Sequence, residues 1–228
     1  MSEYNAWAAV YDTWTADLNA SPAHYISLAK EADGPIVELG VGTGRVAIAI
    51  ARATGKPVLG IDSSPAMLEL AQKKSAGLPL ELRLGDMREL ELEEPAALIY
   101  VPGRSLLHLH GWHDRREVFE RAFASLLPGG RFSFNVFAFS HTFAAQLEGA
   151  TQDQHGVLHT SHYFPADNRI EITRDDDATI RLWWATKAEW DGLLDVAGFE
   201  IEALYGGFER EPFTDASLEY VYVARKPA

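Results

Sequence analysis

Short apolar runs alternate with amphipathic stretches through the middle of this chain, starting at Pro35. The apolar runs are typical of strands buried on both faces of a parallel sheet, and the amphipathic stretches repeat at helical spacing. This alternation predicts an α/β fold with helices on both faces of the sheet. The predicted strands are residues 36–39, 58–61, 80–84, 96–101 and 131–137, and the predicted helices between them are residues 44–53, 65–75 and 112–127.

Further helices and strands are predicted on both sides of this alternating region. Two amphipathic segments, residues 4–18 and 22–32, precede the first strand. We expect them to pack as helices across one edge of the sheet. Near the other end, a helix at 187–197 and strands at 199–205 and 218–224 continue the alternation.

Residues 138–184 interrupt the alternation. Scattered polar residues, a turn at 165–168 and a charge cluster at 174–177 predict hairpins inserted above the sheet. We expect this segment to roof an acceptor site and exclude water, because it holds Phe139, His141, Phe143, Tyr163, Phe164, Arg181, Trp183 and Trp184. The hydrophobic underside of a lid and a dimer interface are the alternatives. The predicted organisation is a single domain over 1–228, with N-terminal helices in 1–34, a core in 35–137 and 185–228, and a β-rich lid in 138–184.

Composition and charge exclude several classes of function. The chain has 20 lysine and arginine residues against 33 aspartate and glutamate residues, for a formal net charge of −13. No basic run follows a phosphate backbone, so nucleic acid is not an expected partner. No signal-peptide pattern and no long apolar stretch is present, which predicts a cytoplasmic protein without a membrane partner. The absence of cysteine removes disulfides and thiolate chemistry.

Three closely spaced glycines, Gly40, Gly42 and Gly44, follow the first predicted strand. Glycine lets a ligand approach the backbone, and free amides point outward where a helix begins. A dinucleotide fingerprint would place its third glycine at Arg45. Glu38 suits the ammonium of an amino-acid-bearing cofactor better than a pyrophosphate. These features favour S-adenosylmethionine, and a strand-to-helix turn without a ligand is the alternative.

Carboxylates also follow the second and third predicted strands. Asp62 is placed to accept both hydroxyls of a ribose, although it can instead cap the helix that begins near Pro65. After the next strand, Asp86 can accept the exocyclic amine of adenine while Met87 lies on the ring face. A simple turn is the alternative for this third motif.

Taken in order, these motifs resemble the small-molecule branch of the class I S-adenosylmethionine-dependent methyltransferases. Residues 4–12, 105–109 and 127–132 also match, so the resemblance spans most of the chain. It implies a Rossmann-like, mostly parallel sheet of seven strands in the order 3-2-1-4-5-7-6, whose last strand alone is antiparallel. S-adenosylmethionine is the implied cofactor. The residues assigned to it are Tyr11, Glu38, Gly40, Gly42, Gly44, Asp62, Ser63, Met67, Asp86, Met87 and Pro102.

The resemblance further implies how this cofactor lies. The glycine loop would support its methionine part, Asp62 would bind the ribose, and Asp86 with Met87 would surround adenine. Tyr11 would close over the methionine end, where a ring face attracts a sulfonium cation. Packing of the leading helix onto the core is the alternative role for Tyr11.

His108 is the second candidate catalytic residue, beside Tyr11. Its Ser-x-x-His-Leu segment resembles small-molecule members that methylate amines or hydroxyls, and an imidazole can take the proton of the attacking acceptor. A structural histidine is the alternative. No metal site is expected, because the histidine-rich segments 107–113 and 155–162 lack flanking ligands.

The sequence therefore predicts in-line transfer of a methyl group from S-adenosylmethionine to nitrogen or oxygen of a small-molecule acceptor, by a monomer or homodimer. Alignment of acceptor, methyl and sulfur is expected to contribute more to the rate than a general base. Two alternatives stay open. One is a catalytically inactive binding or assembly protein with the same fold, and the other is an NAD-binding oxidoreductase.

Overall fold

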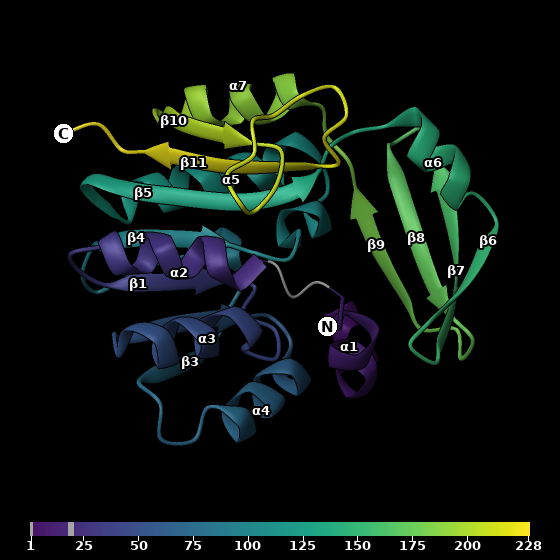
Figure 1. The fold of residues 1–228 in the computed structure, drawn as a ribbon, viewed down its shortest axis with the longest axis horizontal. Helices are drawn as coiled ribbons and strands as arrows, with labels where there is room; N and C mark the ends of the chain where they lie inside the picture. The colour runs from purple at the N-terminus through teal and green to yellow at the C-terminus, as the bar shows by residue number, and fades with distance from the viewer. Residues whose placement is uncertain (1, 18–20) are drawn as a thin grey trace.

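A seven-stranded sheet forms the centre of the computed structural model, which describes residues 2–17 and 21–228 (Figure 1). The strand β11 runs antiparallel to both of its neighbours, and the other pairings in this sheet are parallel. Counted along the core, the order is 3-2-1-4-5-7-6, which confirms the prediction. From edge to edge the strands are β3 (Leu80–Leu84), β2 (Val58–Asp62), β1 (Ile36–Leu39), β4 (Ala96–Val101), β5 (Leu126–Phe137), β11 (Glu219–Arg225) and β10 (Glu200–Tyr205).

Helices cover both faces of this sheet (Figure 1). Successive strand residues point to opposite faces. Ile36 and Leu98 therefore pack with α2 and α3, whereas Val37 and Ile99 belong to the core under α5 and α7. None of the described helices has the length and apolar run needed to cross a membrane. The helices of the core are α2 (Ser21–Glu31), α3 (Arg45–Thr54), α4 (Pro65–Lys74), α5 (Gly111–Ala124) and α7 (Lys187–Ala197).

The strand β5 begins earlier than predicted. It starts at Leu126, which pairs with Ala96, before an irregularity shifts the register. Gly130 allows this bend, because a Cβ there would lie 2.9 Å from the carbonyl oxygen of Leu127. The preceding helix consequently ends at Ala124 instead of residue 127.

The N-terminal segment does not lie across a sheet edge as expected. Residues 2–17, which we call the strap, form a 3-10 turn (Glu3–Asn5) and the helix α1 (Ala8–Trp14). Trp7 is fully buried against Val157 and Ile180 of the inserted segment, so the strap finds its apolar partners there. The second helix, α2, packs on a face of the sheet. The predicted end of the first helix, Leu18, lies outside the described residues.

The inserted segment forms a second, four-stranded antiparallel sheet beside the main one (Figure 1). The predicted turn at 165–168 joins two of its strands, and successive strands pair as hairpins, as predicted. A helix that was not predicted precedes them, and Ser140 caps it by accepting a hydrogen bond from the amide of Phe143 at 3.2 Å. The elements are α6 (His141–Leu147), β6 (Ala150–Gln154), β7 (Val157–Phe164), β8 (Arg169–Arg174) and β9 (Thr179–Trp183).

Candidate active site

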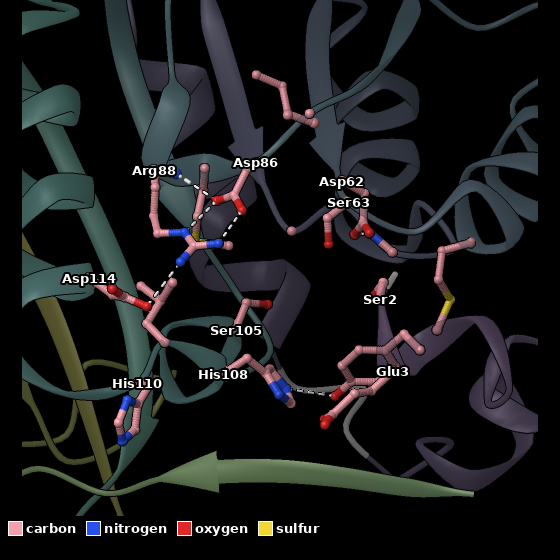
Figure 2. A pocket seen from close by; sticks show the side chains of 18 of the residues that line it. Ser2, Glu3, Asp62, Ser63, Asp86, Arg88, Ser105, His108, His110 and Asp114 are labelled. Atoms are coloured by element: carbon pink, nitrogen blue, oxygen red, sulfur yellow. Dashed lines mark hydrogen bonds and ion pairs between the residues drawn. The ribbon is translucent and has the colours of Figure 1, made fainter.

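A cavity of about 450 Å³ lies where the loops that follow β1, β2, β3 and β4 meet the strap (Figure 2). The carboxyl ends of parallel strands meet at one edge of a sheet, which brings these distant loops together. The strap supplies Tyr4 and Tyr11 to the wall, and β9 supplies Trp183. The residues predicted from sequence that line the cavity are Tyr11, Gly40, Gly42, Asp62, Ser63, Met67, Asp86, Met87 and His108.

Two of the three loop glycines face this cavity. Gly40 has φ +71°, and a Cβ there would lie 2.8 Å from Ser105 Oγ. Gly42 has φ +54°, and a Cβ there would meet no atom within 4 Å, because the residue borders the open cavity. Gly44 differs from the other two glycines, and its contact with the cofactor stays a prediction. It does not line the cavity, and it lets α3 pack closely, since a Cβ there would lie 2.9 Å from Ile48 Cδ1.

Asp62 joins the glycine loop to the loop after β2. Its Oδ2 accepts a hydrogen bond from the amide of Gly42 at 2.7 Å, and its Oδ1 accepts one from Ser64 at 2.8 Å. Burial raises the pKa of Asp62, and the amide hydrogen bonds oppose that rise. Ser64, not Asp62, caps α4, since its side chain accepts from the amide of Met67. Each Asp62 oxygen can still accept a second hydrogen bond.

Asp86 is shared between the cavity and a neighbouring arginine. Arg88 donates to Asp86 from its backbone amide at 2.9 Å and from Nη2 at 2.6 Å, and its Nη1 reaches Asp114 at 3.0 Å (Figure 2). Hydrogen bonds from the Arg88 side chain lower the pKa of Asp86. The carboxylate also caps the 3-10 turn Met87–Glu89. Asp86 therefore stabilises a turn, which was the alternative role for this motif, and it also lines the cavity.

Glu38 and Pro102 are buried and are not among the residues that line the cavity. The Glu38 side chain is 1% exposed and accepts a hydrogen bond from Tyr100 Oη at 2.6 Å. Burial raises its pKa to about 8. The residue that reaches the cavity here is Ser105, which donates from Oγ to the carbonyl oxygen of Pro102 at 2.8 Å. Ser105 belongs to the segment 105–109 that carries the resemblance to methyltransferases, but no role was predicted for it.

His108 pairs with Tyr4, a residue that the sequence reasoning missed. Tyr4 Oη lies 2.8 Å from His108 Nε2, and His108 Nδ1 lies 2.8 Å from the carbonyl oxygen of Arg181. Figure 2 shows the bond between His108 and the strap. Burial lowers the pKa of His108 to about 4 and raises that of Tyr4 well above its ordinary value. The Tyr4 ring contacts Tyr11 edge-on at 5.6 Å between ring centroids.

Polar contacts hold the strap over the cavity. Glu3 forms an ion pair with Arg181 of β9. Asn5 Oδ1 accepts a hydrogen bond from Ser64 Oγ at 2.7 Å, beside Asp62. These contacts tie the strap to both the inserted sheet and the loop after β2.

The large aromatic residues of the insertion have different surroundings, and Phe164 lies partly exposed beside Arg169. Of the aromatic residues predicted to roof the site, all of which lie in the described part of the chain, only Trp183 lines the cavity. Phe139, Phe143 and Tyr163 instead pack around Trp184, with ring centroids 5.7, 5.9 and 5.8 Å away. Across residues 2–17 and 21–228, no group of three or more side chains is arranged to hold a metal ion.

Comparisons with known proteins agree with this architecture. A family model described as "Methyltransferase domain" matches residues 36–130. The cypemycin N-terminal methyltransferase of a Streptomyces species is 23% identical over 223 residues, covering 89% of this chain and 87% of that protein. The solved CcbJ methyltransferase from Streptomyces caelestis is 28% identical with a TM-score of 0.81, covering 97% of this chain and 96% of that one.

A further solved structure shares the fold at lower identity. It is an S-adenosylmethionine-dependent methyltransferase from Clostridium acetobutylicum, 17% identical with a TM-score of 0.83, and the match covers 99% of both chains. The strand order, the open glycine loop and these matches together define a methyltransferase. Residues 36–130 form a methyltransferase domain, and the chain as a whole has the fold of S-adenosylmethionine-dependent methyltransferases, as its motifs predicted.

Proposed function

We propose that this methyltransferase acts on the nitrogen of a small-molecule amine. The observation that carries the proposal is the chemistry of the cavity wall, which accepts hydrogen bonds more than it donates them. Four carboxylates line it, on Glu3, Asp62, Asp86 and Asp114, against the single guanidinium of Arg88 within the described wall. Such a wall favours ligands that carry N–H groups and positive charge.

The residues around the cavity suit S-adenosylmethionine, which supplies an electrophilic methyl group on a sulfonium when bound. We infer that Gly40 and Gly42 support its methionine part and that Asp62 binds the ribose hydroxyls. Ser105 Oγ has already donated its proton to Pro102, so its lone pairs are free to accept from the methionine ammonium. This gives Ser105 the role that was expected of Glu38.

The remaining assignments follow the two ends of the cavity. Asp86 and Met87, with Ser63 and Met67 nearby, form the wall for the adenosine part. Asp86 has both oxygens on Arg88, so adenine would share this carboxylate with the guanidinium. Tyr11 faces the methionine end, where its ring can attract the sulfonium.

An amine acceptor suits the state of His108 better than a hydroxyl does. A hydroxyl needs a base to take its proton during attack, whereas a neutral amine attacks with its own lone pair. His108 has a pKa of about 4 and hydrogen bonds at both ring nitrogens. We infer that His108 orients Tyr4 and that the enzyme acts mainly by aligning the acceptor, the methyl group and the sulfur. The name of the cypemycin N-terminal methyltransferase, a relative, supports nitrogen as the target.

We also infer a cytoplasmic enzyme that works as a monomer or homodimer, without nucleic acid or membrane partners. The formal net charge of −13 supports the absence of nucleic acid and membrane partners, since an acidic protein repels phosphate backbones and anionic lipid.

The test uses matched acceptors that share one carbon skeleton and differ only in an amine or a hydroxyl. Calorimetry first measures binding of S-adenosylmethionine and S-adenosylhomocysteine, and mass spectrometry then counts mass gains of about 14, one added CH₂. We expect gains on amines, with the paired alcohols unchanged. Transfer to the alcohols instead would overturn the amine assignment. Tight cofactor binding with no transfer to any member would favour an inactive binding protein.

A further inference from the structure

The hydrogen bonds that link Arg181, His108 and Tyr4 have a fixed direction. A carbonyl oxygen can only accept, so His108 Nδ1, 2.8 Å from the Arg181 oxygen, carries the ring proton. In a neutral imidazole the other nitrogen then has only a lone pair. The Tyr4 hydroxyl therefore donates to His108 Nε2, at 2.8 Å. The only hydroxyl proton of Tyr4 is therefore used in the hydrogen bond to His108.

Both groups keep these protonation states near neutral pH. Burial lowers the pKa of His108 to about 4, so the imidazole is neutral. Burial, followed by the neighbouring Tyr11 and Asp62, raises the pKa of Tyr4 well above its ordinary value, so the phenol keeps its proton. The consequence is that Tyr4, a residue of the cavity wall, has only lone pairs left on Oη for a further hydrogen bond. An acceptor held there has to donate a hydrogen bond to it.

We propose that Tyr4 limits the number of methyl groups this enzyme adds, so that methylation of an amine ends at the tertiary amine. The proposal rests on the proposed function as an amine methyltransferase. To react, the nitrogen must direct an N–H to Tyr4 and its lone pair to the methyl group at the same time. Neutral primary and secondary amines have both.

A tertiary amine cannot satisfy the two requirements together. In its neutral form it has a lone pair and no N–H, so Tyr4 cannot orient it. When protonated it gains an N–H that Tyr4 can accept, but the proton occupies the lone pair that attack requires. The tertiary amine therefore binds Tyr4 only in an unreactive form, and the transfer that would give a quaternary ammonium is strongly disfavoured.

The same hydrogen bond also favours the transition state. The nitrogen lone pair forms the new N–C bond, and the C–S bond breaks with its electron pair left on sulfur. Positive charge grows on nitrogen, so its N–H bond to Tyr4 becomes charge-assisted and stronger than in the ground state. The resulting ammonium releases a proton to solvent after it leaves the cavity. Each cycle thus replaces one N–H by one methyl.

The experiment uses the full-length protein with excess S-adenosylmethionine. Mass spectrometry counts the methyl groups added to the acceptor. The probe is the primary amine that gains mass fastest in the screen above, supplied also in its N-methyl and N,N-dimethyl forms. We expect gains of one and two methyl groups, with a third transfer at least about 100-fold slower than the second, the scale of a hydrogen bond to a charged group. In Tyr4→Phe, the first two transfers slow by about 10- to 100-fold, and the third-to-second ratio rises.

A matched control removes a different phenol oxygen. Tyr163 Oη donates to Asn168 Oδ1 at 3.1 Å in the inserted sheet, so Tyr163→Phe should leave both rates and ratio unchanged. A fast third transfer by the unaltered enzyme overturns the proposal. So does an unchanged third-to-second ratio in Tyr4→Phe, because crowding would then set the limit. Failure of every amine in the screen would instead contradict the proposed function.

A second measurement needs no acceptor. Nitrogen NMR of histidine-labelled protein reports the tautomer of His108, whose signal is identified by its loss in His108→Gln. We expect the neutral form protonated at Nδ1 at pH 7. A proton on Nε2, in either the neutral or the charged ring, would free the Tyr4 hydroxyl to donate and would overturn the proposal.

Discussion

Asp12 of the strap accepts a hydrogen bond from Thr43 of the glycine loop, with 2.6 Å between Oδ1 and Oγ1. Asp12 follows Tyr11 directly, so this contact holds the Tyr11 ring over the cavity. The strap thus closes on the same loop that supports the cofactor. We expect this contact to help the strap retain a bound cofactor.

We predict that Asp12→Ala weakens cofactor binding by increasing the dissociation rate. The side chain is 47% exposed, so the expected rise in Kd is about 3- to 10-fold, the scale of one ordinary hydrogen bond. Stopped-flow dissociation of S-adenosylhomocysteine measures it. Lys74→Ala is the control, because it removes the ion pair with Asp12 and keeps the bond to Thr43. Equal dissociation rates in both variants would argue against the strap contact.

Asp62→Asn should bind S-adenosylmethionine about 10- to 100-fold more weakly. The amide replaces one accepting oxygen by a donor, which disturbs both the backbone contacts and the ribose hydrogen bonds. Calorimetry gives the Kd, and circular dichroism reports whether the fold is kept. Asp153→Asn is a matched control, since Asp153 accepts a backbone hydrogen bond from Gly156 at 2.7 Å outside the cavity wall. Unchanged affinity in Asp62→Asn would remove the ribose assignment.

Glu38 should make the protein less stable as pH rises from about 4.5 to about 8. Burial raises its folded pKa from an ordinary 4.5 to about 8, so the folded protein holds a proton that the unfolded chain has lost. The stabilisation is complete below pH 4.5 and disappears through pH 8, with a total on the order of 5 kcal/mol. Glu38→Gln keeps an acceptor for Tyr100 and lacks this titration. Urea unfolding at pH 5 and pH 8.5 should therefore show a smaller loss in the variant, and equal losses would contradict the prediction.

His24 should contribute to loss of stability at acid pH. Its side chain is buried beside Ser133, with 3.2 Å between Nε2 and Oγ, and burial lowers its pKa from 6.5 to about 4. A lowered histidine pKa means that the folded state resists protonation. Its contribution is present above pH 6.5 and is lost as pH falls through 4. His24→Gln should reduce the stability difference between pH 7 and pH 4.5 by about 2–3 kcal/mol, measured by urea unfolding. If His24→Gln loses as much stability between pH 7 and pH 4.5 as the unaltered protein, His24 does not contribute to acid unfolding.

The sequence by itself determined the order of elements and the position of the cofactor loops. The strands at 36–39 and 96–101 and the helix at 187–197 have the predicted bounds. Apolar periodicity is a local property, and a strand buried on both faces differs from a helix within a few residues. Glycines at a strand end, and an acid after the next strand, likewise act through the backbone around them. Such features can be recognised without knowing what lies across the cavity.

Only the tertiary structure decided which side chains reach the cavity. Tyr4 and His108 lie 104 positions apart, and nothing in the local pattern pairs them. Glu38 faces Tyr100 behind the wall, and Trp183 lines the cavity while its neighbour Trp184 packs in the core. Adjacent residues of a strand point to opposite sides, and which side meets the cavity depends on how separate segments pack. The direction of the Tyr4 hydrogen bond, on which the limit to methylation depends, arises from a backbone carbonyl in a third segment.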